Sequence, residues 1–155
     1  MATTRSAITQ ALVETIQSMD QFSSASVFGV SSPRFLDNPP GTVYVEVVPG
    51  SQVDEEGAQG WGKGIFRVSV CIFIQMIVDR EQDEITALSN GNNGLLQYID
   101  ALDTAILANT LGGTLASPFA PEGIEAPRAD EEKSGWFMQQ RDYSCVYAFS
   151  YPGVT

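Results

Sequence analysis

The sequence predicts an α+β fold in which a mixed or antiparallel β-sheet packs against two main α-helices. Apolar residues recur at helical spacing in two segments and alternate strictly in a third, which is the pattern of a long strand. The chain has 155 residues, of which 43% are hydrophobic, and this suffices for a core without disulfides or metal. No internal repeat or linker divides the sequence, so we predict a single domain over residues 1–155.

Two segments have the spacing of amphipathic helices. The first, residues 4–19, places four apolar residues on one face: Ile8, Leu12, Ile16 and Met19. The second, residues 95–109, has a core stripe of four apolar residues: Leu95, Ile99, Leu102 and Ile106. We expect Asp100 and Asp103 on the solvent side of this second helix, and Gly112 and Gly113 at its end.

Four segments have the composition of β-strands: 26–30, 42–48, 66–78 and 136–151. In residues 66–78 every even position is apolar and the odd positions are mixed, which predicts one fully packed face. The last segment has an aromatic-rich stripe at its odd positions: Tyr143, Cys145, Tyr147, Phe149 and Tyr151. These rings suit either the core or an interface, where Tyr and Phe are enriched. Cys71 and Cys145 lie in apolar runs, so we expect buried reduced thiols, with a disulfide as the alternative.

Two long acidic loops are predicted between these elements, at residues 49–64 and 117–135. The first is rich in glycine and contains three consecutive acids, Asp54, Glu55 and Glu56. Loops of this length in a compact domain are usually functional or disordered. Trp61 is a candidate interface contact, because an aromatic ring in a glycine-rich loop suits an interface anchor.

Two motifs resemble ligand sites but lack the residues that the chemistry needs. Residues 57–63 match the first seven positions of a phosphate-binding P-loop. Gly64 stands where the magnesium-binding Ser or Thr is required, and a strand is expected next instead of a helix. A second cluster contains four acids: Asp79, Glu81, Asp83 and Glu84. It lacks the glycine and terminal glutamate of a calcium loop, and acids are favoured at a helix start in any case.

The composition argues against an enzyme. The chain contains no histidine, so the commonest general base and metal ligand is absent, and its two distant cysteines do not form a usual zinc site. We therefore expect no catalytic residues, no metal and no cofactor. Catalysis by Asp and Glu alone is the remaining enzymatic alternative.

The charge balance limits the partners of the protein. The chain has 19 acidic and 8 basic residues, a net charge of −11, which argues against a positively charged clamp on nucleic acid. An acidic wall would instead suit a channel through which DNA slides without being held, although solubility alone also accounts for this charge. The N-terminus lacks the apolar run of a signal peptide, and no segment is long enough to span a bilayer. We therefore expect no membrane contact, and we expect the protein to assemble in the cytoplasm.

The order of predicted elements resembles a known family. The elements that carry the resemblance contain, in order, the segments 8–12 (ITQAL), 43–47 (VYVEV), 66–72 (FRVSVCI), 95–102 (LLQYIDAL) and 143–149 (YSCVYAF). This order, over nearly the whole chain, is similar to that of the tail terminator proteins (tail completion or neck proteins) of long-tailed bacteriophages such as lambda. The acidic loops at 49–64 and 117–135 are longer than in the smallest members of that family.

The resemblance implies a mixed sheet packed against helices and subunits joined head to tail in a closed ring, typically a hexamer. In such proteins the ring caps the tail tube, stops its polymerisation, and offers a surface to the head connector. The partners would be further copies of the chain, the tail tube protein and the head connector, with DNA passing through without specific binding. Asp54, Glu55 and Glu56 would then line the channel, and Trp61 would contact a neighbour.

Two other classes of protein are also compatible with the sequence. One is a different virion protein, such as a head–tail connector or a tube subunit, because these are also small α+β proteins. The other is a small non-viral binding module, or an enzyme without a visible signature. The mass of the protein in solution distinguishes them, because a ring gives a discrete multiple and a binding module gives one or two copies.

Overall fold

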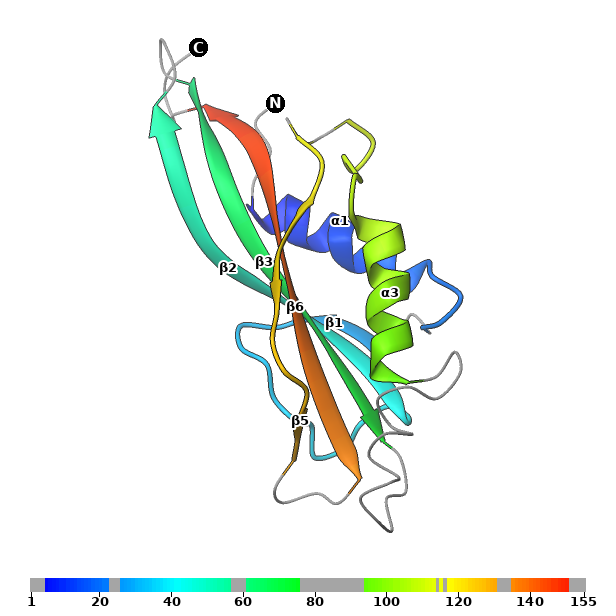
Figure 1. The fold of residues 1–155 in the computed structure, drawn as a ribbon. Coiled ribbons are helices and arrows are strands. Elements are labelled where there is room, and N and C mark those ends of the chain that lie inside the picture. Colours follow the sequence, from blue (N-terminus) through cyan, green and yellow to red (C-terminus); the bar gives the residue numbers. More distant parts are fainter. Residues whose placement is uncertain are drawn as a thin grey trace.

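The computed structural model describes residues 5–22, 26–56, 61–75, 94–113, 115, 117–130 and 135–150. The elements in these residues are, in order, α1 (Arg5–Gln17), β1 (Val27–Gly29), β2 (Val43–Glu56), β3 (Trp61–Gln75), α3 (Leu95–Ile106), β4 (Ala120–Ile124), β5 (Arg128–Ala129) and β6 (Trp136–Ser150). They form one sheet and two helices, so the predicted α+β class is confirmed (Figure 1).

The sheet is mixed, with strand order β1-β2-β3-β6-β4, and β5 pairs with β6 beside β4. Strands β1 and β2 are parallel, and the other pairs are antiparallel. The strand predicted at 66–78 is therefore confirmed as central, although it begins earlier, at Trp61, and residues 76–78 lie outside the described residues. Since β3 pairs with β2 on one side and with β6 on the other along most of its length, it is the best-protected strand of the described sheet.

Both helices pack on one face of the sheet and form the main core with it. Seven of the helix residues predicted to face the core are buried in it: Ile8, Leu12, Ile16, Leu95, Ile99, Leu102 and Ile106. Val13 and Tyr98 are also buried in this core, and they were not predicted. The even positions of β3 from Phe66 to Ile74 lie opposite them and are also buried. Tyr143, Cys145 and Tyr147 of β6 belong to the same core, so the aromatic stripe is core at these three positions. Phe149 and Tyr151 lie outside the residues whose side chains the structure describes.

The opposite face of the sheet carries a smaller apolar cluster, made by Tyr44, Cys71, Phe73, Trp136 and Met138. The segment between β1 and β2 crosses this cluster and packs side chains onto it, among them Phe35, which lies edge-on to Phe73 at 5.1 Å. Tyr44 stacks on Phe73 at 4.4 Å, and its hydroxyl accepts a hydrogen bond from the backbone N–H of Leu36. This half of the second face is therefore covered by the chain itself.

The prediction of a loop at residues 49–64 is wrong over most of its length. Strand β2 continues to Glu56 and pairs with the start of β3, in register from Gln52 opposite Phe66 to Glu56 opposite Gly62. An irregularity between Pro49 and Gln52 shifts the register, and pairing then resumes. Pairing with β3 satisfies the backbone groups, so the segment is a strand even though glycines and acids dominate its composition.

The prediction of a loop at residues 117–135 is also wrong in part. Strands β4 and β5 lie within this range, and both pair with β6. The second helix ends earlier than predicted, at Ile106, and the glycines at 112 and 113 belong to a later turn. Leu107 has an extended backbone and forms an isolated parallel β-bridge with Phe119. Ala108 follows with a positive φ of 65°. No helix among the described residues is long and apolar enough to cross a membrane.

Candidate interaction surfaces

The residues predicted to form a functional loop lie together at one end of the β2–β3 hairpin. Asp54, Glu55 and Glu56 are in register with Gly64, Lys63 and Gly62, and Trp61 is the first residue of β3. Figure 1 shows the paired ends of β2, β3 and β6 extending beyond the two helices. The structure therefore brings the predicted acids and Trp61 to one end of the sheet, but it places them in strands and not in a loop.

The glycine that follows the P-loop-like segment has a structural reason. Gly62, Lys63 and Gly64 are strand residues of β3, whereas residues 57–60 lie outside the described part of the chain. A Cβ atom at Gly64 would lie 2.7 Å from the ring of Tyr147, which is buried in the core. Close packing of this ring accounts for the glycine without any phosphate.

The acidic cluster of Asp79, Glu81, Asp83 and Glu84 lies outside the described residues. Among the residues that are described, no group of three or more potential ligands is placed to hold a metal ion. The two cysteines are free and buried, as predicted. Burial raises the pKa of each thiol to about 12, so neither is a thiolate nucleophile near neutral pH.

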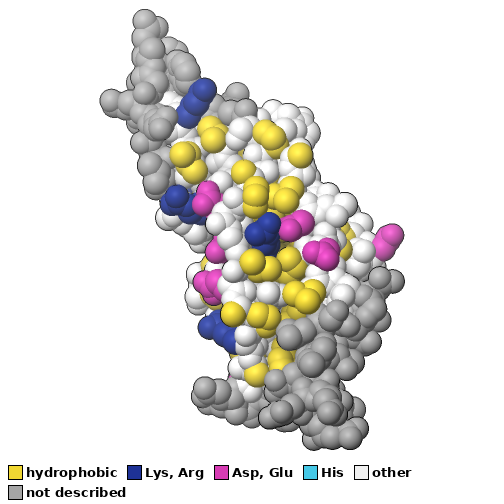
Figure 2. All heavy atoms as spheres, viewed as in Figure 1, with side chains coloured by type: hydrophobic (Ala, Val, Ile, Leu, Met, Phe, Trp, Pro, Cys, Tyr) yellow, Lys and Arg dark blue, Asp and Glu magenta, His cyan; other side chains and the backbone are white. Residues whose placement is uncertain are grey.

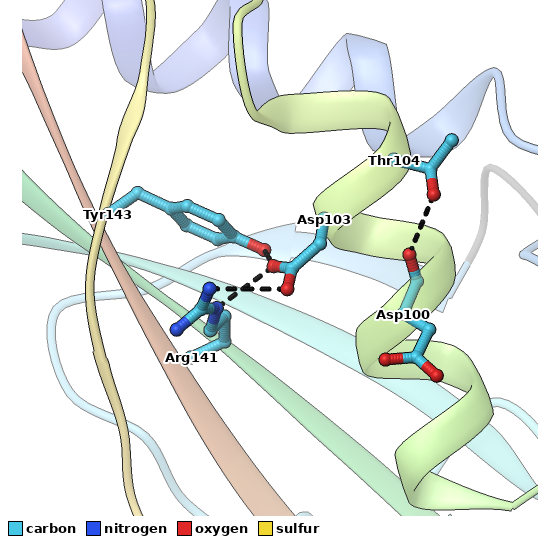
Figure 3. A network of polar contacts seen from close by, with 5 residues as sticks. All are labelled: Asp100, Asp103, Thr104, Arg141 and Tyr143. Atoms are coloured by element: carbon cyan, nitrogen blue, oxygen red, sulfur yellow. Dashed lines mark hydrogen bonds and ion pairs between the residues drawn. The ribbon is translucent and has the colours of Figure 1, made fainter.

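A polar network that was not predicted joins α3 to β6 (Figure 3). Asp103 was expected on the solvent side of its helix, but its carboxylate accepts two hydrogen bonds from Arg141, at 2.9 and 3.2 Å. The hydroxyl of Tyr143 donates a third, at 2.7 Å, and the guanidinium carbon of Arg141 lies 5.4 Å from the centre of the Tyr143 ring. The expectation for Asp103 was wrong because an arginine on the core-facing side of β6 requires a carboxylate partner.

Burial and hydrogen bonding determine the protonation of this network. The hydrogen bonds to Asp103 raise the pKa of Arg141, so the guanidinium stays charged. Burial, and then donation to Asp103, raise the pKa of Tyr143 well above its usual value, so its hydroxyl stays protonated. Neither group changes charge over the pH range in which proteins work, which makes the network a fixed connection between helix and sheet.

A signal for this network was present in the sequence. Arg141 occupies an odd position of β6, in line with the apolar-face residues Tyr143, Cys145 and Tyr147. An arginine at such a position is expected to have a buried partner, and an acid on the helix that covers the strand is the natural choice.

The other polar group on the sheet lies on the face away from the helices. Ser69 donates a hydrogen bond of 2.6 Å to Asp142, and the amide of Gln140 donates to both. Arg67 forms an exposed ion pair with Glu122 of β4 at 3.9 Å, beside a shallow hollow of about 340 Å³. The first of these contacts connect β3 to β6, and the ion pair connects β3 to β4 across β6.

Glu46 of β2 is a fully buried carboxyl group on the same face. One of its oxygens accepts a hydrogen bond of 2.8 Å from the backbone N–H of Arg34, and the other has no hydrogen-bond partner among the described residues. Burial raises the pKa of Glu46 above its ordinary value. This residue helps to hold the segment between β1 and β2 against the sheet, at the expense of a poorly solvated carboxylate.

The two edges of the sheet differ in chemistry. Strand β4 forms one edge and exposes Ile124 between two acids, Glu122 and Glu125. At the other edge, a groove of about 680 Å³ opens between α1 and β1, with Arg5 among its lining residues.

Figure 2 shows the face that carries α3 and β4, where hydrophobic side chains form a band that is interrupted by a basic side chain beside acidic ones. Such surfaces suit protein contacts.

Comparisons with known proteins give a match at the level of fold. No family model matches the chain, and no curated protein does. A chain from a solved structure of the virion of a native gene transfer agent particle has a TM-score of 0.55 and 11% identity, covering 94% of both chains. A second solved chain is 16% identical and covers 96% of this chain and 94% of its own. Its TM-score of 0.45 is too low to indicate a shared fold. The first match shows that this chain has the fold of a chain found in a virion.

Proposed function

We propose that this protein is a structural component of a phage-like virion. The observation that carries the proposal is the fold shared, over 94% of both chains, with a chain of a gene transfer agent virion. Within the virion, the proposed role is that of a tail terminator: a ring that caps the tail tube, stops its polymerisation and offers a surface for joining the head. The order of elements that resembles tail terminators supports this finer role.

The proposed ring is made of identical subunits joined head to tail, typically six, and its further partners are the tail tube protein and the head connector. Asp54, Glu55 and Glu56 are proposed to face the channel, where negative charge would let DNA pass without binding it. Trp61, at the same end of the hairpin, is proposed to contact a neighbouring subunit or partner. The role involves no catalytic step and no cofactor.

The most direct test of the finer role is a tube-length assay. Purified protein is added to polymerising tail tube protein from the same particle, and the tubes are measured by electron microscopy. The proposal predicts short tubes with a ring at one end, and particles that lack the protein should have tails of uncontrolled length or no attached heads. Unchanged tube lengths and normal particles without the protein would overturn the role of terminator.

A further inference from the structure

We propose that the β4 edge of one subunit docks into the α1–β1 groove of a second copy of this chain, and that this contact joins the subunits head to tail. The β4 edge is defined by Glu122, Ile124 and Glu125, and the α1–β1 groove by Arg5, Thr9, Val13, Gly29, Val30 and Pro49. The inference rests on the proposed ring and names the two surfaces that close it.

The β4 edge has the properties of an inserting surface. Strand β4 pairs only with β6 among the described strands, so its other side is a free sheet edge. Ile124 is 48% exposed, the most exposed large hydrophobic residue in the described part of the chain. An exposed isoleucine on a free edge is a liability unless a partner covers it.

The backbone at this edge is held in place before any partner arrives. The N–H of Glu125 donates to the carbonyl of Gln140 at 3.0 Å, and the carbonyl of Glu125 accepts from the side-chain amide of Gln139 at 3.2 Å. Gln139 is itself buried, so Ile124 and the Glu125 side chain are presented from a backbone fixed on both sides. Little conformational entropy is then lost when they bind.

The α1–β1 groove has the complementary chemistry. Val13, Val30 and Pro49 give it apolar walls that suit an isoleucine side chain, and Arg5 provides a cation for an acid beside it. Gly29 adds no side chain to the floor of the groove, and Val13 and Thr9 lie beside it, at 3.8 and 4.0 Å from the place of a Cβ atom. In a chain with a net charge of −11, an arginine at a groove is suited to the acidic edge of another copy.

The topology determines the symmetry of the contact. Strands β1 and β4 lie at opposite edges of one sheet, so the inserting edge and the receiving groove of one subunit are on different sides. Two copies that join in this way each keep one unused surface. Such a heterologous contact repeats from subunit to subunit and gives a ring when the rotation closes.

The test mixes two variants with complementary defects. Ile124→Asp disables the edge and leaves the groove intact, whereas Arg5→Glu disables the groove and leaves the edge intact. Both positions are exposed, and an acid at the start of α1 suits the helix dipole, so both variants should fold. Each variant alone should be monomeric, with a dissociation constant raised at least about tenfold. A mixture should form one intact contact per pair and stop at the heterodimer by native mass spectrometry.

A charge exchange provides a second readout. Glu125→Arg should weaken assembly by itself, and the same change combined with Arg5→Glu in one chain should restore it. Glu14→Lys, which changes an exposed charge of α1 away from the groove, is the matched control and should assemble as the native protein does. Native rings that are unaffected by these variants would overturn the inference and leave the proposed function standing. A native protein that remains monomeric, also at tube ends, would overturn both.

Discussion

The connection between α3 and β6 is tested by Asp103→Ala. The side chain of Arg141 is 12% exposed, and in the variant it loses both hydrogen bonds to the carboxylate, at 2.9 and 3.2 Å. Tyr143 loses its acceptor at 2.7 Å at the same time. Removing one partner of a buried ion pair costs about 3–5 kcal/mol, because the remaining charge is left without compensation. Since Asp103 is 27% exposed and partly screened by water, we expect about 3 kcal/mol.

The assay is equilibrium unfolding in urea, followed by far-ultraviolet circular dichroism, with the change taken from the shift in midpoint and the slope. Asp100→Ala is the matched control, because Asp100 is an exposed acid on the same helix, three residues earlier, as Figure 3 shows. The control should change the free energy of unfolding by less than about 0.5 kcal/mol. If Asp103→Ala also changes it by less than about 0.5 kcal/mol, the network is an ordinary surface contact and the reasoning is refuted.

Three further variants test the core and the buried carboxyl group. Leu102→Ala should cost about 2–5 kcal/mol in a urea melt, because Leu102 is fully buried, whereas Leu96→Ala on the exposed side of α3 should cost much less. Gly64→Ala should cost about 1–3 kcal/mol, because its Cβ would lie 2.7 Å from a buried tyrosine ring, and Gly123→Ala, with open space around it, should not. Burial raises the pKa of Glu46 above 4.5 in the folded state, so the native protein loses stability as the pH rises from about 4.5 through that raised pKa. Glu46→Gln should remove this loss, and urea midpoints of the two proteins should diverge between pH 4 and pH 8; midpoints that stay parallel would contradict the assignment.

The parts of the fold that the sequence predicts well are those in which burial follows a simple period. The alternation in β3 and the helical stripe of α3 identify the core-facing residues, because one face of each element is packed and the other is not. These features depend on local pattern, which one sequence contains.

The parts that fail depend on partners distant in the chain. Residues 51–56 and 61–64 look like a loop by composition, and they are strands because β2 and β3 pair with each other there. Asp103 looks like a solvent-exposed acid, and it is bound because Arg141 lies 38 residues later in sequence and beside it in space. The two sheet edges also become visible as surfaces only when the strand order is known.

The proposed role places the protein in the virion, at one end of the tail tube. The most direct measurement is labelling of intact particles with a gold-conjugated antibody against the protein, followed by electron microscopy. The account predicts one site of label per particle, at the junction of head and tail. Label along the whole tail, or particles that contain none of the protein, would contradict it.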